Sequence, residues 1–190
     1  MFPYAITREP TITPLPLNYT QPTPTWNRQK LQYKGRGCGL STFPGILLTT
    51  YTCVHNVDLK KNRIAKLPPS ISTLKQLRML HMNSNRLTSL PGSICKLRNL
   101  STLCLERNSL KTLPNSICNL QQLERLYLNN NQISHLPECI GKLRNLETFL
   151  ISKNSLVSIP DSIGDLNKLQ DFQAHRNKLS SLPESIGFNV

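Results

Sequence analysis

The chain has 190 residues, 38% of them hydrophobic and 6% aromatic, and a formal net charge of +13 from 23 Lys and Arg against 10 Asp and Glu. This length fits one ordinary domain, whose core must be filled by aliphatic side chains because aromatic rings are so few. The longest apolar stretch, near residues 43–48, is far shorter than the roughly 20 residues of a membrane helix. The positive charge favours an acidic partner, an anionic membrane surface or nucleic acid, and the scattered bases do not choose among them.

Residues 1–36 form a segment rich in Pro and Thr that has neither helical nor strand periodicity. We predict that this segment is a disordered tail. Its first residues include Pro3, Pro10, Pro14 and Pro16 and lack the apolar core of a secretory signal. We therefore expect a cytoplasmic protein.

The six cysteines lie between Cys38 and Cys139 without C-x-x-C spacing. This distribution favours a reduced, intracellular setting over a disulfide framework. We interpret Cys95, Cys118 and Cys139 as small apolar residues, which is how a free cysteine usually behaves.

Residues 37–66 are expected to hold an N-terminal cap and the first repeat, because Leu40, Phe43 and Pro44 imperfectly match the pattern that follows. From residue 54 a strict 23-residue repeat appears, and residues 67–190 continue it until the sequence stops partway through a unit. The same position of six units is occupied by asparagine: Asn62, Asn85, Asn108, Asn131, Asn154 and Asn177. A period in the twenties with regular leucines predicts an α/β solenoid, a horseshoe of about six repeats.

The structure of one repeat can be predicted from the segment LERLYLNNNQISHLPECI, residues 123–140. Period-two spacing of Leu126 and Leu128 predicts a strand of a parallel concave sheet, with both leucines facing inward. Asn131 then lies where the chain turns, and its amide can bond to backbone groups of that turn and of the next repeat. Apolar residues three apart after Pro137 predict a short helical or 3-10 segment on the convex side.

The consensus of these units, LPxxIxxLxxLxxLxLxxNxL, resembles the Ras-group subclass of leucine-rich repeats over residues 40–190. That subclass includes Shoc-type, Ras-suppressor and Scribble-like intracellular proteins. The resemblance implies an intracellular scaffold or adaptor for protein–protein interaction, in Ras-type signalling, cell polarity or adhesion.

The predicted concave face puts Asp58, His81 and Cys104 side by side on adjacent strands, the residue types of a nucleophile, a base and an orienting group. A metal site formed by His81, Cys104 and Glu106 is the other chemical alternative. An open sheet face has no pocket and no evident oxyanion donors, so we expect neither catalysis nor a metal, cofactor or small-molecule substrate.

A cluster on the same face is better suited to binding a protein. Arg107 and Lys153 occupy one column two repeats apart, with Arg125, Tyr127 and Leu150 between and beside them. Tyr and Arg are enriched among residues that dominate binding energy, and the bases would attract an acidic partner. We predict a concave partner-binding site made of these five residues.

Two further expectations concern partners. Nucleic acid, or another anionic ligand, is the alternative to a protein, but concave aromatic residues are few and Asp58, Glu106 and Asp171 interrupt the positive charge. The sequence stops without a polar capping segment, so we also expect either a longer array or self-association through the C-terminal end.

Overall fold

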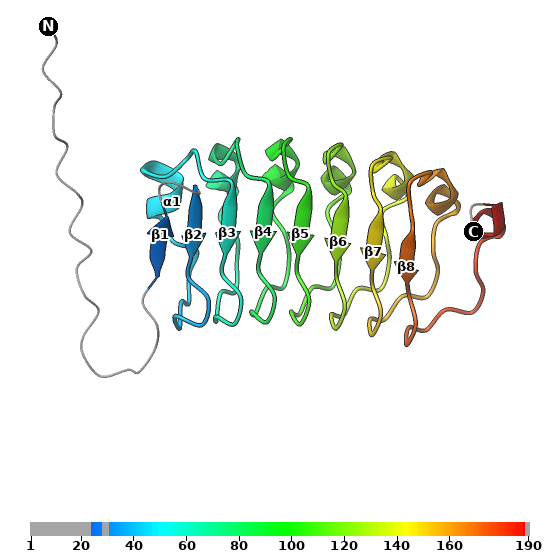
Figure 1. Ribbon diagram of the computed structural model, residues 1–190. Coiled ribbons are helices and arrows are strands. Elements are labelled where there is room, and N and C mark those ends of the chain that lie inside the picture. The colour runs from blue at the N-terminus through cyan, green and yellow to red at the C-terminus, as the bar shows by residue number, and fades with distance from the viewer. Residues whose placement is uncertain (1–23, 28–30, 189–190) are drawn as a thin grey trace, which may run out of the picture.

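The computed structural model describes residues 24–27 and 31–188, which form a single-layer sheet with short helical segments stacked along it (Figure 1). Each strand has three residues: β1 (Thr25–Asn27), β2 (Gln32–Lys34), β3 (Asn56–Asp58), β4 (Met79–His81), β5 (Thr102–Cys104), β6 (Arg125–Tyr127), β7 (Thr148–Leu150) and β8 (Asp171–Gln173). Strands β2 to β8 are parallel and lie in chain order, while β1 pairs antiparallel with β2. The predicted solenoid with a parallel concave sheet is confirmed.

One helical segment follows each strand from β2 to β8. These segments are α1 (Ile46–Thr49) and the 3-10 helices η1 (Pro69–Thr73), η2 (Gly92–Lys96), η3 (Asn115–Asn119), η4 (Ile140–Lys142), η5 (Asp161–Asp165) and η6 (Glu184–Phe188). Most begin directly after a proline, whose fixed φ holds the chain extended before the turn starts. None of the helices in the described part of the chain is long and apolar enough to cross a bilayer.

The core lies between the sheet and the 3-10 segments, and it is built from columns of identical positions. Leu126 and Leu128 are fully buried, as the period-two pattern predicts, and Leu126 pairs with Leu103 and Phe149 on the neighbouring strands. Burial of each leucine contributes about 1.5–3 kcal/mol, and the neighbouring repeats supply the surface that buries it.

The asparagines form a continuous ladder behind the turns. In Asn131, Nδ2 donates to the carbonyl oxygens of Leu105 (3.0 Å) and Leu128 (2.9 Å), while Oδ1 accepts from the Leu110 amide (3.0 Å). The other asparagines of the ladder repeat this pattern: Asn62, Asn85, Asn108, Asn154 and Asn177. A carbonyl that lies between two successive ladder asparagines therefore accepts a hydrogen bond from both of them. These shared bonds join the repeats along the whole array.

A second ladder of hydroxyl groups runs along the 3-10 segments. The Oγ atoms of Ser93, Ser116, Ser162 and Ser185 each donate to a carbonyl 24 residues earlier, at 2.7–2.9 Å. Cys139 takes the same position in η4's repeat, and its Sγ lies 3.4 Å from the Asn115 carbonyl. The hydrogen bonds of the four serine hydroxyls connect the convex turns, where strands provide no pairing.

The N-terminal boundary differs from the expectation of a disordered tail over residues 1–36. Residues 24–27 and 31–36 are ordered, because β1 and β2 extend the sheet by a hairpin and the Tyr33 side chain is 7% exposed in the core. Residues 1–23 and 28–30 of the predicted tail lie outside the described residues. Leu40, Phe43 and Leu47 then pack at this end of the core, in the region expected to form the cap.

Candidate functional site

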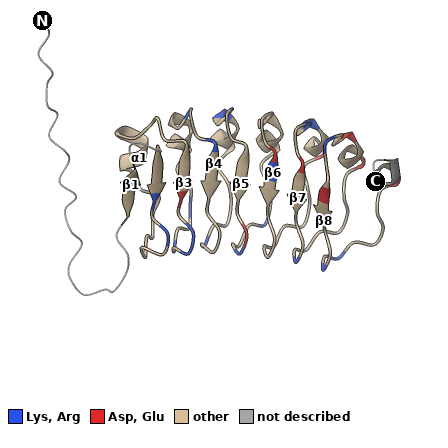
Figure 2. Cartoon of the chain, in the orientation of Figure 1, with Lys and Arg blue, Asp and Glu red and all other residues tan. Residues whose placement is uncertain are grey.

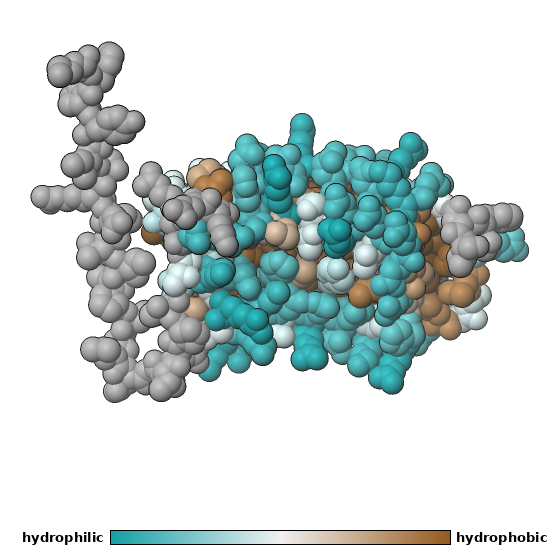
Figure 3. Space-filling view, viewed as in Figure 1, coloured by the Kyte–Doolittle hydropathy of each residue, from teal (hydrophilic) through white to brown (hydrophobic). Residues whose placement is uncertain are grey.

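The exposed side of the sheet is formed by three rows of side chains that cross the strands. The outer positions of β6 are Arg125 and Tyr127, and Asn129 follows where the strand ends. Corresponding positions on adjacent strands pair directly, so these side chains form rows across the face. Figure 3 shows this face as largely hydrophilic, with paler and brown atoms near its middle.

Arg125, Tyr127 and Leu150 are brought together on the strand face. Tyr127 pairs with Leu150 on β7, and both side chains are partly exposed. Arg125 lies on the same strand, and its guanidinium approaches Glu124 at 3.2 Å and Glu147 at 4.0 Å. Burial raises the pKa of Tyr127, with a smaller raising effect from Cys104, so its hydroxyl stays protonated and can donate. The three side chains combine an apolar surface, a ring and a guanidinium held in a fixed orientation.

Arg107 and Lys153 lie away from these three residues. Each occupies the turn after its strand, with a left-handed backbone (φ 53° and 57°) and an exposed side chain. Their backbone amides donate to the carbonyls of Asn129 and His175 in the next repeats, each at 2.9 Å. The predicted cluster of five residues is therefore divided between the strand face and its border.

Asp58, His81 and Cys104 do lie side by side on β3, β4 and β5. No hydrogen bond joins His81 to Cys104, and the His81 Nδ1 is buried without a partner. Burial raises the pKa of the Cys104 thiol to about 12 and lowers the pKa of His81. A thiol that stays protonated near neutral pH is a poor nucleophile. Within the described residues, no group of three or more His, Cys, Asp or Glu is placed to hold a metal ion.

Cross-strand hydrogen bonds organise the row at the strand ends. Asn83 donates to the Glu106 carboxylate, and Ser152 Oγ lies 2.9 Å from His175 Nδ1. Asn129 Oδ1 accepts from the Ser152 amide at 2.7 Å. Aligning the repeats places these residues in one column. Which of them donates a hydrogen bond to which neighbour is seen only in the structure, where the strands are stacked.

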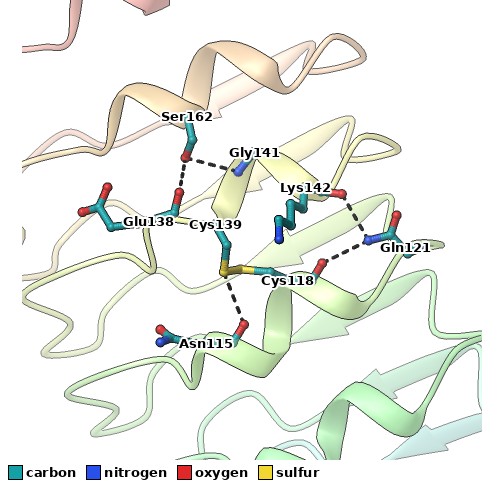
Figure 4. Close-up of a disulfide and its surroundings, with 8 residues drawn as sticks. All are labelled: Asn115, Cys118, Gln121, Glu138, Cys139, Gly141, Lys142 and Ser162. Carbon is teal, nitrogen blue, oxygen red and sulfur yellow. Dashed lines mark hydrogen bonds between the residues drawn. A yellow bond between two sulfur atoms is a disulfide. The ribbon is translucent and has the colours of Figure 1, made fainter.

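Cys118 and Cys139 form a disulfide between adjacent repeats, 21 residues apart in the sequence (Figure 4). The expectations that both are small apolar residues and that the cysteines are all reduced are therefore wrong. Cys118 follows the buried isoleucine of η3, and Cys139 occupies the serine column of the next unit, so the two side chains meet diagonally across the convex side. Cys95 remains free and partly buried, and Cys38, Cys53 and Cys104 are also free.

Two hollows lie near the ends of the array. One, of about 170 Å³, lies on the concave side and is lined by residues that include Lys34, Asp58 and His81. This volume is below that of usual small-molecule sites, about 300–1,000 Å³. The other, of about 390 Å³, is lined by residues that include Phe172 and Ile186 at the C-terminal end, where brown atoms gather in Figure 3.

Two leucine-rich-repeat families match the chain, the leucine-rich repeat region over residues 52–132 and the leucine rich repeat over residues 121–179. The repeats are therefore leucine-rich repeats, as their sequence pattern predicts. No curated protein matches the chain.

Solved structures of leucine-rich-repeat proteins are similar to the chain. A leucine-rich-repeat protein of Leptospira interrogans is 27% identical with a TM-score of 0.62, and the match covers 80% of this chain and 50% of that one. The ectodomain of the receptor kinase GASSHO1/SCHENGEN3 from Arabidopsis thaliana, in complex with CASPARIAN STRIP INTEGRITY FACTOR 2, is 27% identical with a TM-score of 0.62, covering 78% and 22%. A TDR receptor is 30% identical with a TM-score of 0.67, covering 72% and 25%. The chain thus spans half or less of the length of these proteins.

Proposed function

We propose that this chain is a protein-binding module that holds its partner on the concave face, with Arg125, Tyr127 and Leu150 as the central anchors. The observation that supports this most directly is the pairing of Tyr127 with Leu150 beside an oriented Arg125, on a face whose side chains are largely polar. Such a combination is typical of interface hot spots. Leucine-rich repeats commonly bind proteins, and one similar structure contains a bound factor.

The chemistry of the border suggests the kind of partner. Arg107 and Lys153 are exposed where the central strands end, so they would attract an acidic protein and accelerate its encounter with the face. The resemblance of the repeats to the Ras-group subclass supports a role as a cytoplasmic scaffold or adaptor in Ras-type signalling. This role and this location are part of the proposal.

The decisive experiment is capture of partners from cell extract by the chain and by an Arg125→Glu, Tyr127→Ala double variant. Both side chains are only partly buried, so we expect the variant to keep its circular dichroism spectrum and to lose the captured protein. A Lys75→Glu, Gln76→Ala variant is the matched control, because both of its residues are exposed in a turn away from the concave face. Unchanged capture by the folded double variant would move the site to the convex side or to residues 1–36.

Nucleic acid is the second candidate, and the net charge of +13 is the observation in its favour. The outward strand positions of β3 to β8 hold only two rings, those of His81 and Tyr127, which gives nucleobases little surface for stacking. A salt titration of RNA binding separates the two functions. Nucleic-acid binding would weaken steeply with salt, whereas a partner anchored by Tyr127 and Leu150 would be retained.

Self-association through the C-terminal end is a further proposal. Leu182 is 60% exposed, and the neighbouring hollow of about 390 Å³ has an apolar lining. Light scattering coupled to size exclusion tests it, with Leu182→Asp as the variant. A monomer at all protein concentrations would contradict the proposal.

A further inference from the structure

The turns that follow the strands carry a row of positive charges along one edge of the solenoid. The positions immediately before and after each ladder asparagine are basic in seven of twelve cases. We name these residues the basic edge: Lys61, Arg63, Arg86, Arg107, Lys153, Arg176 and Lys178. All seven side chains are exposed, and Figure 2 shows blue segments in the turns along the lower border of the molecule, with a red segment below β5.

The basic edge contains no acidic residue. The remaining five positions are Ser84, Ser109, Asn130, Gln132 and Ser155. Every Asp and Glu in the described part of the chain lies instead on a strand, at its end or in the 3-10 segments and the turns beside them. The ion pairs among the described residues involve only Arg125 of the bases, but the carboxylate of Glu106, the residue before Arg107, interacts electrostatically with that base. The edge therefore carries bases in five of its six turns; the turn with Asn130 and Gln132 has none, and Glu106 directly precedes Arg107.

Backbone hydrogen bonds hold the main chain of six of these seven residues in place. The amides of Lys61, Arg107 and Lys153 donate to the next repeat at 2.9 Å, and those of Arg63, Arg86 and Lys178 donate to the preceding one at 2.8–2.9 Å. Because strands are about 4.8 Å apart, the six turns span roughly 24 Å in one line. The charges form a rigid row on turns of similar length rather than a mobile tail.

We propose that the basic edge docks this protein on an anionic lipid bilayer. A cluster of four to eight Lys and Arg is sufficient for attraction to anionic lipid headgroups. The turns contain no aromatic residue on which nucleobases would stack. They also provide neither a helix nor a strand that enters a DNA groove. A row of exposed charges along an outer border suits a broad surface better than a narrow strand of nucleic acid. The concave face, which lies beside the edge, stays free for its partner.

The test is flotation of the purified chain with phosphatidylcholine vesicles that contain no phosphatidylserine or 30% phosphatidylserine. We expect binding only to the anionic vesicles, with a loss of binding as salt rises, because the exposed charges are screened. A Lys61→Asn, Arg86→Gln, Arg176→Asn variant should bind them about 100-fold more weakly, since each base near the surface contributes about fivefold. Asparagine is chosen for the two left-handed positions because Asn130 already occupies that row at φ 58°.

The matched control removes the same charge from the opposite edge. Lys75, Arg98 and Arg144 occupy one exposed column in the turns before the strands, and the variant changes all three to Gln. It should retain most of the vesicle binding, and so should the Arg125→Glu, Tyr127→Ala variant, which tests the concave face separately. Equal losses in the two triple variants would show that net charge alone is responsible and would overturn the proposal. No binding to phosphatidylserine vesicles, or edge-dependent binding that is tighter to duplex DNA or RNA, would also overturn it.

Discussion

Removal of a single ladder asparagine tests how the repeats are joined. Asn131→Ala deletes three hydrogen bonds, and the partner groups are affected differently. The Leu105 carbonyl keeps a bond from Asn108, and the Leu128 carbonyl keeps one from Asn154. The Leu110 amide loses its acceptor in a buried turn, and an orphaned buried donor costs about 1–3 kcal/mol. When the loss of the two bonds to shared carbonyls is added to this cost, we expect the free energy of unfolding to fall by about 2–3 kcal/mol.

Urea unfolding followed by circular dichroism measures this loss, which should move the midpoint while leaving the m-value unchanged. Gln132→Ala is the control, because this exposed neighbour makes no ladder contact and should change stability by less than about 0.5 kcal/mol. Asn129→Ala is the less suitable control, since Asn129 Oδ1 accepts from the Ser152 amide. Equal losses for Asn131→Ala and Gln132→Ala would refute the ladder as a source of stability.

A double-mutant cycle sharpens the same argument. Asn108→Ala with Asn131→Ala removes both donors from the Leu105 carbonyl, so the loss should exceed the sum of the single losses by about 1 kcal/mol. Asn85 shares no carbonyl with Asn131, and that pair should be additive. Additivity in both pairs would mean that water replaces the missing donor.

Three further predictions concern the convex side and the thiols. Gly141→Ala should destabilise the fold by about 1–3 kcal/mol in urea unfolding, because an added Cβ would lie 2.0 Å from the Ser162 carbonyl oxygen, whereas Gly92→Ala should be tolerated. Cys139→Ser keeps the hydroxyl ladder but opens a disulfide that spans 21 residues, so the oxidised protein should lose about 3 kcal/mol and thiol titration of the denatured, unreduced chain should rise from four to five. Burial raises the pKa of Cys104 from 9.0 to about 12, so its contribution to stability is complete below pH 9 and is lost as pH rises towards 12; Cys104→Ala should flatten this alkaline loss, and Cys53, which is exposed, should alkylate first.

Much of the fold could be predicted because all of the repeats share one sequence pattern. The alternation of Leu126 and Leu128 marks a strand, and the asparagine at a fixed distance marks the turn, so the rows across the sheet follow from alignment alone. The register of Arg125 against Thr148 and Tyr127 against Leu150 agrees with that alignment. Because the repeats can be aligned with one another, the pairing of strands that are distant in the sequence can be inferred, which a single sequence does not usually allow.

Features that depend on one repeat alone were not predictable in this way. The strands β1 and β2 precede the first ladder asparagine, and their pairing requires a turn in which Leu31 has a φ of 47°. The disulfide joins two different columns, Cys118 in one and Cys139 in the other, and alignment compares residues only within a column. In the candidate site, alignment put Arg107 and Lys153 in a column of their own, and the prediction that they form one cluster with Arg125 did not allow for the left-handed turn in which both lie.

The left-handed turns also allow a test of why the basic edge exists. Lys61, Arg107 and Arg176 have φ between 53° and 56°, a region in which residues other than Gly and Asn are disfavoured. Asn130 shows that the same turn accepts asparagine, so local backbone preference does not explain the bases. Lys61→Asn with Arg176→Asn should therefore stabilise the chain, by about 0.5–1 kcal/mol per site in urea unfolding, while it weakens binding to anionic vesicles. A variant that is both less stable and fully able to bind vesicles would show that these bases support the fold and not a membrane contact.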